Sequence, residues 1–343
     1  MEKRIIHLGN LIIGGNHPIV AQTMLKCKTS NLEEAIEQIN LVISYKVNLI
    51  RVAVLDVEDA LAIKLIKDHY ANQVINIIAD IHFDYQLALL AIENGADKIR
   101  LNPSNLTKEE QLKAVVNKAK EKHIPIRIGI NGGSLYHGEL LDNNKILALL
   151  DQEIKALEKL DFYDIVLSAK LNNLSQAIEI NKIIDAKYPY PLHLGLTEAG
   201  SLIDATIKSA IFLHAMKESN IGSTVRVSLN GPIQTEVTVL KRILINLDYQ
   251  KGIKLIICPS CGRLQFKMDN YVKQIEAICY NSTKVLVVAF MGCIVNGPGE
   301  ARGANIAIVG GVNNVSFYLE GKLTRVVAED KLIATFVEYL NQY

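Results

Sequence analysis

The repeat that decides the fold is residues 48–101, NLIRVAVLDVEDALAIKLIKDHYANQVINIIADIHFDYQLALLAIENGADKIRL. Short runs rich in Ile, Val and Leu alternate here with longer amphipathic stretches near residues 57–70 and 84–94. The short runs predict β-strands, and the longer stretches predict helices with one apolar face. Strands that alternate with helices in this way require right-handed crossovers and a parallel sheet.

The same unit recurs from residue 20 to about residue 248, and it predicts a barrel domain over residues 1–248. The expected strands are Val20–Met24, Asn48–Val54, Ile75–Ile81, Ala96–Leu101, Ile124–Ile130, Asp164–Lys170, Leu192–Thr197 and Thr224–Leu229. Eight such units match an α/β fold, the closed (β/α)8 TIM barrel, which typically takes about 250 residues. An open doubly wound sheet is the alternative, which is weakened because no Gly-x-Gly-x-x-Gly loop follows the first strand.

The alternation of strands and helices ends near residue 250, and residues 249–343 predict a small α+β domain with its own core. The expected elements are strands at Lys254–Cys258, Lys284–Phe290, Asn305–Val309 and Val315–Leu319, and helices at Asp269–Tyr280 and Glu329–Leu340.

The composition is that of a packed globular protein, with 49% hydrophobic and 21% charged residues in a chain of 343. A net charge of +1 gives no global field that would attract nucleic acid or an anionic membrane, and we expect neither as a partner. Residues 1–15 lack the apolar core of a signal peptide, and no apolar run approaches the roughly 20 residues of a membrane span. A cytoplasmic location is therefore the expectation.

Basic residues recur at the same place in the predicted repeat, near the carboxyl ends of the strands, where barrel enzymes have their active sites. They are Arg51, Arg100, Arg127, Lys170 and Arg226. A cation inside an apolar strand is costly unless it is paired with a carboxylate or faces a ligand. Five converging cations predict a polyanionic substrate, most simply a diphosphate. Pairing with neighbouring carboxylates is the alternative. His82, beside Asp80, is a further candidate site residue.

Three cysteines follow predicted strands of the small domain, so that their thiols can meet at one end of its sheet. Cys258 and Cys261 form a Cys-x-x-Cys pair, and Cys293 precedes a Gly-Pro-Gly turn. A zinc ribbon would need a second such pair, and a thioredoxin-like redox pair leaves Cys293 unexplained. Three thiolates fit a [4Fe–4S] cluster with one distinctive iron.

The fourth ligand of such a cluster stays open between Cys27, Cys279, a carboxylate and the substrate itself. Cys279 lies on the apolar face of a predicted helix, which favours a core thiol. Glu300 follows the Gly-Pro-Gly turn, and a carboxylate is a harder and more weakly held ligand than a thiolate. A ligand of that kind would leave one iron free to take a substrate oxygen.

With these residues together, the sequence resembles the 4-hydroxy-3-methylbut-2-en-1-yl diphosphate synthase family of the non-mevalonate isoprenoid pathway. The resemblance runs from about residue 4 to about residue 335. The matching stretches are Ala79–Tyr85, Ile124–Gly129, Leu192–Gly200, Cys258–Arg263 and Gly292–Ala301. The last two, CPSCGR and GCIVNGPGEA, are together highly specific.

The resemblance implies the two-electron reductive ring opening of 2-C-methyl-D-erythritol 2,4-cyclodiphosphate to (E)-4-hydroxy-3-methylbut-2-enyl diphosphate, with loss of water. It implies that Cys258, Cys261, Cys293 and Glu300 hold the cluster and that Glu198 protonates the departing hydroxyl as a general acid. The substrate-binding residues that we expect are Arg51, Asp80, His82, Arg100, Asn102, Arg127, Asn131, Lys170, Thr197, Arg226, Ser228 and Arg263.

The resemblance also implies flavodoxin or ferredoxin as electron donor, and a homodimer in which one chain's cluster domain closes over the partner's barrel. This chain departs from the family at Lys26, where small polar residues are more common. Lys26 either adds a phosphate contact or is simply solvated. One rival interpretation is a pterin- or corrinoid-type barrel with a zinc-stapled tail. Another is a zinc-bearing nucleic-acid-binding module, which the absence of concentrated basic residues in the cysteine domain disfavours.

Overall fold

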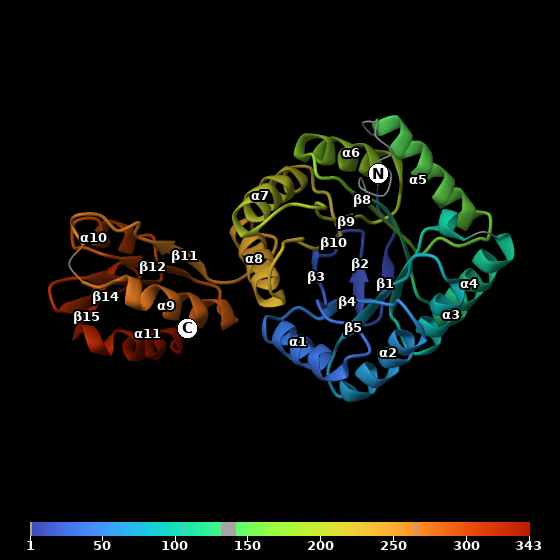
Figure 1. Ribbon diagram of the computed structural model, residues 1–343. Coiled ribbons are helices and arrows are strands. Elements are labelled where there is room, and N and C mark those ends of the chain that lie inside the picture. The colour runs from blue at the N-terminus through green and yellow to red at the C-terminus, as the bar shows by residue number, and fades with distance from the viewer. Residues whose placement is uncertain (1, 107, 132–141, 265) are drawn as a thin grey trace. The chain divides into compact units, whose positions relative to one another are not determined.

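The computed structural model describes residues 2–106, 108–131, 142–264 and 266–343, which divide into two compact units, Met1–Ile243 and Leu244–Tyr343. In the first unit, strands β3 to β10 form one parallel sheet in the order β8-β7-β6-β5-β4-β3-β10-β9. A parallel bridge between Leu167 and Leu192 joins β8 to the segment that enters β9, so the sheet closes on itself (Figure 1). The predicted TIM barrel is confirmed, and the open doubly wound sheet is wrong.

The strands of the barrel are short, buried and rich in β-branched residues, as the sequence pattern indicates. They span β3 (Val20–Met24), β4 (Leu49–Ala53), β5 (Asn76–Asp80), β6 (Lys98–Arg100), β7 (Ile126–Asn131), β8 (Ile165–Lys170), β9 (His193–Leu194) and β10 (Thr224–Val225). β9 and β10 are shorter than predicted, and β9 ends where Gly195 adopts a φ of +148°.

Amphipathic helices surround the ring of strands (Figure 1). They are α1 (Leu32–Ser44), α2 (Val57–His69), α3 (Tyr85–Glu93), α4 (Glu109–Lys122), α5 (Asn143–Glu158), α6 (Leu174–Lys187), α7 (Leu202–Glu218) and α8 (Ile233–Asn246). Side-chain caps fix where several of them begin. The Asp56 side chain accepts a hydrogen bond from the Asp59 N–H at the start of α2, and Asn173 does the same for Gln176 at α6.

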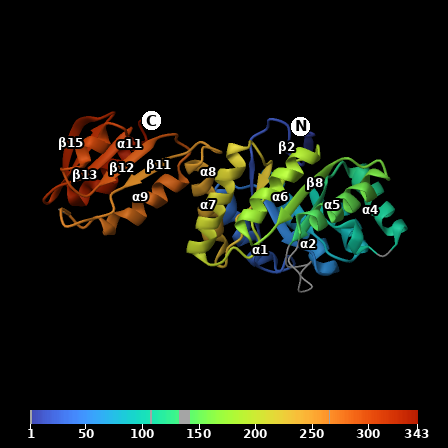
Figure 2. The ribbon, with the colours of Figure 1, turned by 90° about the horizontal axis from the view of Figure 1, so that it is seen from above.

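A β-hairpin that the sequence pattern did not predict packs over the amino-terminal end of the barrel. It consists of β1 (Ile6–Leu8) and β2 (Leu11–Ile13), paired antiparallel. Ile6, Leu8 and Ile13 are buried against apolar side chains near the starts of the barrel strands, among them Leu49 and Val166. In the side view of Figure 2 the hairpin lies at one end of the barrel, beside the N terminus.

The second unit is a mixed five-stranded sheet in the order β11-β12-β13-β14-β15. The first three strands are parallel and the last two pairings are antiparallel. Its elements are β11 (Lys254–Ile257), α9 (Asp269–Asn281), β12 (Val287–Met291), α10 (Gly297–Ala301), β13 (Ile306–Gly310), β14 (Asn314–Leu319), β15 (Lys322–Ala328) and α11 (Leu332–Leu340). The small α+β domain is thus present, with β15 and α10 as additions to the predicted elements.

Alternate residues of these strands pack on the two faces of the sheet, as the pleat of a β-strand requires. Phe290, Ile308 and Phe317 join the apolar core that α9 and α11 cover. Ala289 and Ala307 lie in a second, smaller core with Ala301 of α10 on the opposite face. Helix α10 is thereby fixed against the sheet next to the predicted cluster ligands.

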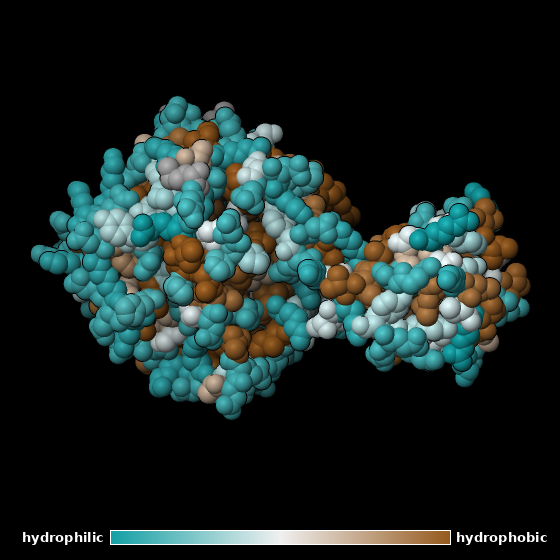
Figure 3. Space-filling model, turned by 180° about the vertical axis from the view of Figure 1, so that it is seen from behind, coloured by the Kyte–Doolittle hydropathy of each residue, from teal (hydrophilic) through white to brown (hydrophobic). Residues whose placement is uncertain are grey.

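The face of the first unit that is visible in Figure 3 is largely hydrophilic at its rim, and hydrophobic residues gather nearer its centre. None of the helices in the described part of the chain combines the length and the apolar character needed to cross a membrane.

Candidate active site

Three of the five predicted strand cations, Arg51, Arg100 and Arg127, gather around one buried carboxylate inside the barrel, whereas Arg226 pairs with Glu236. Asp80, Arg100 and Arg127 are Cα partners across β5, β6 and β7, so their side chains project on the same side of the sheet. An Arg51 Nη2 lies 2.5 Å from an Asp80 oxygen, and the Arg100 Nε lies 3.8 Å from the other. Asp80 and its three arginines thus form one charged group.

The ionisation of Asp80 is set by this group. Burial alone raises the pKa of Asp80, but Arg51, a hydrogen bond from His82 and Arg100 outweigh it and hold the pKa well below its usual range. His82 also lies 3.0 Å from an Arg100 Nη1 through its Nδ1. The same Arg100 Nη1 lies 3.2 Å from the other ring nitrogen, Nε2, so either tautomer of His82 can accept from it. The structure therefore brings Arg51, Asp80, His82 and Arg100 together as predicted.

Arg127 and Lys170 are almost fully buried, and no carboxylate among the described residues forms an ion pair with either. Arg127 donates from Nη1 to the Ser168 hydroxyl at 2.7 Å. Burial lowers the pKa of Lys170, and the nearby Arg127 and Arg226 lower it further. Such an excess of buried positive charge is unfavourable without an anion and is expected where an anionic ligand binds.

Asn102 holds the backbone at the mouth of the barrel. Its amide donates to the Gly129 carbonyl at 2.9 Å, and its carbonyl oxygen accepts from the Gly129 N–H at 2.9 Å. Both ends of the Asn102 side chain thus bind backbone in this structure, so its expected substrate contact stays a prediction. Asn131 and Lys170 are Cα partners at the ends of β7 and β8.

A cavity of about 430 Å³ opens beyond the carboxyl ends of β9 and β10. Its lining includes Glu198, Arg226 and Ser228, three of the predicted site residues. Thr197 is half-buried beside them, with its N–H donating to the Leu171 carbonyl. Glu198 is exposed and has a φ of +51°, a left-handed conformation that costs a non-glycine residue about 1 kcal/mol or more and that recurs at functional sites.

Several buried polar residues of the barrel were not anticipated. Lys98 is fully buried and its Nζ has no hydrogen-bond partner among the described residues. His193 is also fully buried. Its Nδ1 lies 2.8 Å from the Thr224 hydroxyl, and its Nε2 has no hydrogen-bond partner in the described part of the chain. Lys98 stands two positions before Arg100 on the same strand. Residues two positions apart in a strand point to the same face of the sheet. The sequence position of Lys98 could therefore have placed it inside the barrel with Arg100.

The predicted cluster ligands of the second unit lie at the carboxyl ends of β11 and β12. The Cys258 N–H donates to the Phe290 carbonyl at 2.9 Å, which aligns the two strand ends. A Cβ on Gly292 would lie 3.6 Å from the Cys258 sulfur and 2.5 Å from a Leu264 methyl. A larger residue at position 292 would therefore require the Leu264 side chain to move, whereas its contact with the Cys258 sulfur would be an ordinary one.

The thiol chemistry fits a metal cluster. All five cysteines are free, and Cys279 alone lies in the apolar core under α9, as expected of a core thiol. Hydrogen bonds from the Asn296 and Val295 N–H groups lower the pKa of Cys293, and Arg263 lowers it further. Hydrogen bonds to the sulfurs are also one of the features that set the reduction potential of iron–sulfur clusters.

The described residues contain no ready group of three or more His, Cys, Asp or Glu side chains gathered to hold a metal ion. Cys261 is exposed, and Glu300 lies on the short helix α10. The four predicted ligands therefore lie near the ends of neighbouring strands and on a helix, but their side chains do not form a closed metal site. They are Cys258, Cys261, Cys293 and Glu300. Their role as ligands stays a prediction.

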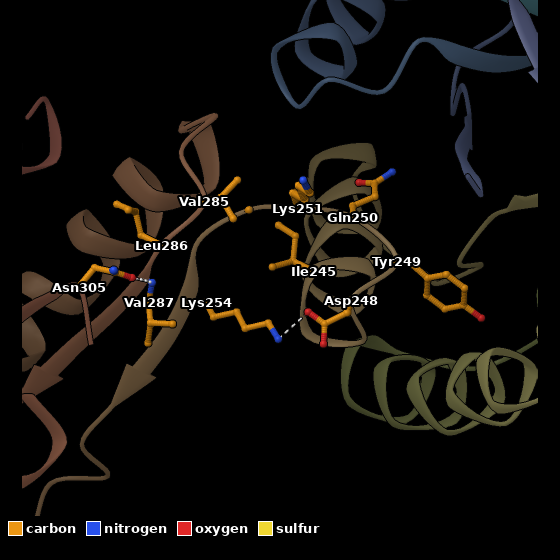
Figure 4. Close-up of a pocket in the computed structure, with 11 residues that line it drawn as sticks. Ile245, Asp248, Tyr249, Gln250, Lys251, Lys254, Val285, Leu286, Val287 and Asn305 are labelled. Atoms are coloured by element: carbon orange, nitrogen blue, oxygen red, sulfur yellow. Dashed lines mark hydrogen bonds and ion pairs between the residues drawn. The ribbon is translucent and has the colours of Figure 1, made fainter. Parts of the chain in front are cut away.

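The second unit also contains a cavity of about 540 Å³, shown in Figure 4. It lies at the amino ends of the parallel strands, lined by Lys254, Val287 and Asn305, with an Asp248–Lys254 ion pair at 2.7 Å beside it. The cysteines lie at the opposite, carboxyl ends of the same strands. This cavity is therefore separate from the predicted cofactor site.

Known proteins with similar sequences cover both units. Residues 3–241 match the family described as the GcpE TIM-barrel domain, and residues 254–342 match the GcpE protein C-terminal domain. A protein of Caldanaerobacter subterraneus is 44% identical over 99% of this chain and 96% of its own length. One of Clostridium perfringens is 43% identical over 99% and 98%. Both are named 4-hydroxy-3-methylbut-2-en-1-yl diphosphate synthase (flavodoxin).

Solved structures resemble the barrel in fold alone. A dihydropteroate synthetase has a TM-score of 0.54 at 12% identity, covering 71% of this chain and 100% of its own. A type I 3-dehydroquinate dehydratase of Clostridium difficile has a TM-score of 0.53 at 14% identity, covering 72% and 98%. The likeness to a pterin enzyme is thus one of architecture. The sequence matches extend over the barrel and the cysteine-bearing unit alike, and the chain belongs to the GcpE family.

Proposed function

We propose that this chain is an oxidoreductase that opens the ring of 2-C-methyl-D-erythritol 2,4-cyclodiphosphate to give (E)-4-hydroxy-3-methylbut-2-enyl diphosphate and water, with two electrons from a flavodoxin. The identity of 43–44% over 99% of the chain to relatives that carry the name of this synthase supports the reaction. The flavodoxin donor has the same support, because it stands in the relatives' names. The observation that carries the proposal is the buried positive charge of Arg127 and Lys170, which lies beside the Asp80 group and has no ion pair among the described residues.

The barrel residues bind and orient the diphosphate in this proposal. Arg51 and Arg100 keep Asp80 ionised and are held by it in fixed positions. Arg127 and Lys170 meet the anion with charges that no carboxylate among the described residues neutralises by an ion pair. Because these side chains are buried before substrate arrives, little reorganisation accompanies binding. Glu198, at the cavity beside Arg226, donates the proton that leaves with the hydroxyl as water.

Cys258, Cys261, Cys293 and Glu300 would hold a [4Fe–4S] cluster. When bound, such a cluster supplies the electrons one at a time. The lowered pKa of Cys293 favours its thiolate, which is the form that binds metal. Glu300, at the first turn of α10, contributes the harder oxygen ligand beside the three sulfurs.

Metal analysis and turnover test the proposal separately. Anaerobically purified protein should be brown and contain about four iron and four sulfide per chain. One zinc and no iron would exclude the cluster. The purified protein, given the cyclic diphosphate and a chemical reductant, should release the linear alkenyl diphosphate. Full activity in Cys293→Ser would contradict the ligand role, and Cys27→Ser, in the barrel unit, is the matched control that should keep its iron.

The proposal also includes a homodimer and a cytoplasmic location. Analytical sedimentation tests the first, and cell fractionation tests the second.

A further inference from the structure

The loop that follows β3 carries Lys26, whose side chain reaches back over the mouth of the barrel. The Leu25 N–H donates to the Arg51 carbonyl at 3.0 Å, and the Lys26 N–H donates to the Gln38 side chain at 2.9 Å. These bonds tie the loop to β4 on one side and to α1 on the other. Lys26 therefore occupies a fixed place at the carboxyl end of β3.

Lys26 shares one buried carboxylate with Arg226. Glu236 of α8 is fully buried and accepts from the Arg226 Nε at 2.9 Å and the Arg226 Nη2 at 3.1 Å. The same carboxylate accepts from the Thr23 hydroxyl at 2.8 Å, and the Lys26 Nζ lies 2.8 Å away. Two cations are thus held side by side by a single negative charge.

The ammonium of Lys26 retains donor capacity toward the cavity. A lysine ammonium has three N–H donors. In the described residues one of them meets Glu236, and a second lies 3.4 Å from the Leu229 carbonyl. Leu229 lines the 430 Å³ cavity together with Arg226 and Ser228, and the Lys26 side chain is 30% exposed. Lys26, Arg226 and Glu236 together leave one positive charge beside that cavity.

Lys28, two residues further along, is a lysine of the same loop whose charge is balanced by carboxylates. Its Nζ lies 2.9 Å from Asp56 and 3.6 Å from Glu58, and its side chain is 46% exposed. Two carboxylates face this one cation, so the group has no positive excess to offer an anion. The balance of charge is the reverse of that around Lys26.

We propose that Lys26 is a further substrate-binding residue of this chain, whose ammonium and the Arg226 guanidinium, held together by Glu236, bind the same phosphate group. The inference rests on the proposed function and adds one residue to its substrate-binding set. It assigns Glu236 as the positioning residue for both cations. The interaction is a charge-assisted hydrogen bond, which is stronger than a neutral one.

The test measures binding of inorganic diphosphate to the full-length protein by calorimetry, together with steady-state turnover. Lys26→Met should weaken diphosphate binding about tenfold, which corresponds to about 1.4 kcal/mol. KM should rise by a similar factor while kcat stays near the wild-type value, as expected for binding that is equal in the ground and transition states. Lys26→Arg should restore most of the affinity, and Lys28→Met should leave it unchanged.

A purely structural role predicts a different pattern. If Lys26 only neutralises Glu236, Lys26→Met lowers the unfolding temperature and leaves both the diphosphate Kd and KM within about twofold of wild type, and that result overturns the inference. A third outcome would separate the two proposals. If the wild type binds diphosphate, Lys26→Met binds it more weakly and neither protein turns over the cyclic diphosphate, the inference stands and the proposed reaction is rejected.

Discussion

Asp80→Asn is the perturbation whose outcome follows most directly from the barrel's charges. The substitution keeps the shape of the side chain and removes the negative charge that Arg51 contacts at 2.5 Å and Arg100 at 3.8 Å. Asp80 is 6% exposed, so solvent cannot replace the lost charge. Removing one partner of a buried ion pair typically costs about 3–5 kcal/mol, because the other charge stays buried and uncompensated. In a unit of this size, 1 kcal/mol shifts the unfolding temperature by about 2–4 °C. The unfolding temperature should therefore fall by about 10 °C.

Thermal unfolding followed by calorimetry at pH 7, with and without inorganic diphosphate, measures this effect. Diphosphate should raise the unfolding temperature of the variant more than that of the wild type, because the anion supplies the charge that Asp80 provided. Asp68→Asn removes a carboxylate from an exposed pair with Lys64 and should change little. A loss of less than about 1 kcal/mol in Asp80→Asn, or equal diphosphate stabilisation of both proteins, would refute the reasoning.

The pH dependence gives a second check on the same variant. The folded-state pKa of Asp80 lies well below its usual value of about 3.9, so its stabilisation is fully present above the unfolded pKa. That stabilisation is lost only as the pH falls through the lower, folded-state pKa. The stability difference between wild type and Asp80→Asn should thus be constant from about pH 5 to pH 8. A difference that disappears within that window would contradict the assignment.

Three other substitutions test separate parts of the barrel unit. Glu198→Gln should keep the brown colour and iron content while suppressing turnover, which visible absorbance and product analysis measure together. Glu153 of α5 accepts hydrogen bonds from the Ser104 N–H at 3.0 Å and from the Ser104 hydroxyl, so Glu153→Gln should destabilise the barrel by about 1–3 kcal/mol in urea unfolding. Lys98→Met should stabilise it by about 1–3 kcal/mol, because it removes an unpaired buried cation. Burial lowers the pKa of Lys98, so wild-type stability should rise from pH 7 to pH 9, and this rise should be smaller in Lys98→Met.

The fold was predictable where hydrophobic periodicity is strong and was missed where the local signal is weak. Val20–Met24 was predicted to the residue, from the β-rich run that lies between Pro18 and Lys26. Strand β15, KLTRVVA, is mostly exposed and forms the edge of its sheet, so it lacks the apolar alternation of a half-buried strand. Helix α10 contains Gly-Pro-Gly, which are poor helix formers, and its packing against β12 and β13 stabilises it instead.

Site residues were likewise predictable where neighbouring sequence marks them, and were missed where their role depends on a long-range contact. Arg51, Arg100 and Arg127 stood out, because a charged residue within an apolar strand is conspicuous in the sequence. Glu236 was missed, because it comes from a helix and reaches Thr23 across 213 positions of sequence. A single sequence contains no local trace of such a long-range contact, which depends on closure of the barrel.

The hairpin at the amino-terminal end of the barrel has an electrostatic consequence for the opposite end. Its apolar side chains, Ile6, Leu8 and Ile13, replace water beneath the charged interior with a medium of low permittivity. Low-permittivity walls on one side of a set of charges focus their field toward the side that remains open to solvent. The potential of the buried cations is thereby directed out of the carboxyl-terminal mouth, where an approaching anion meets it. It is screened less than it would be if the amino-terminal end of the barrel were open to water.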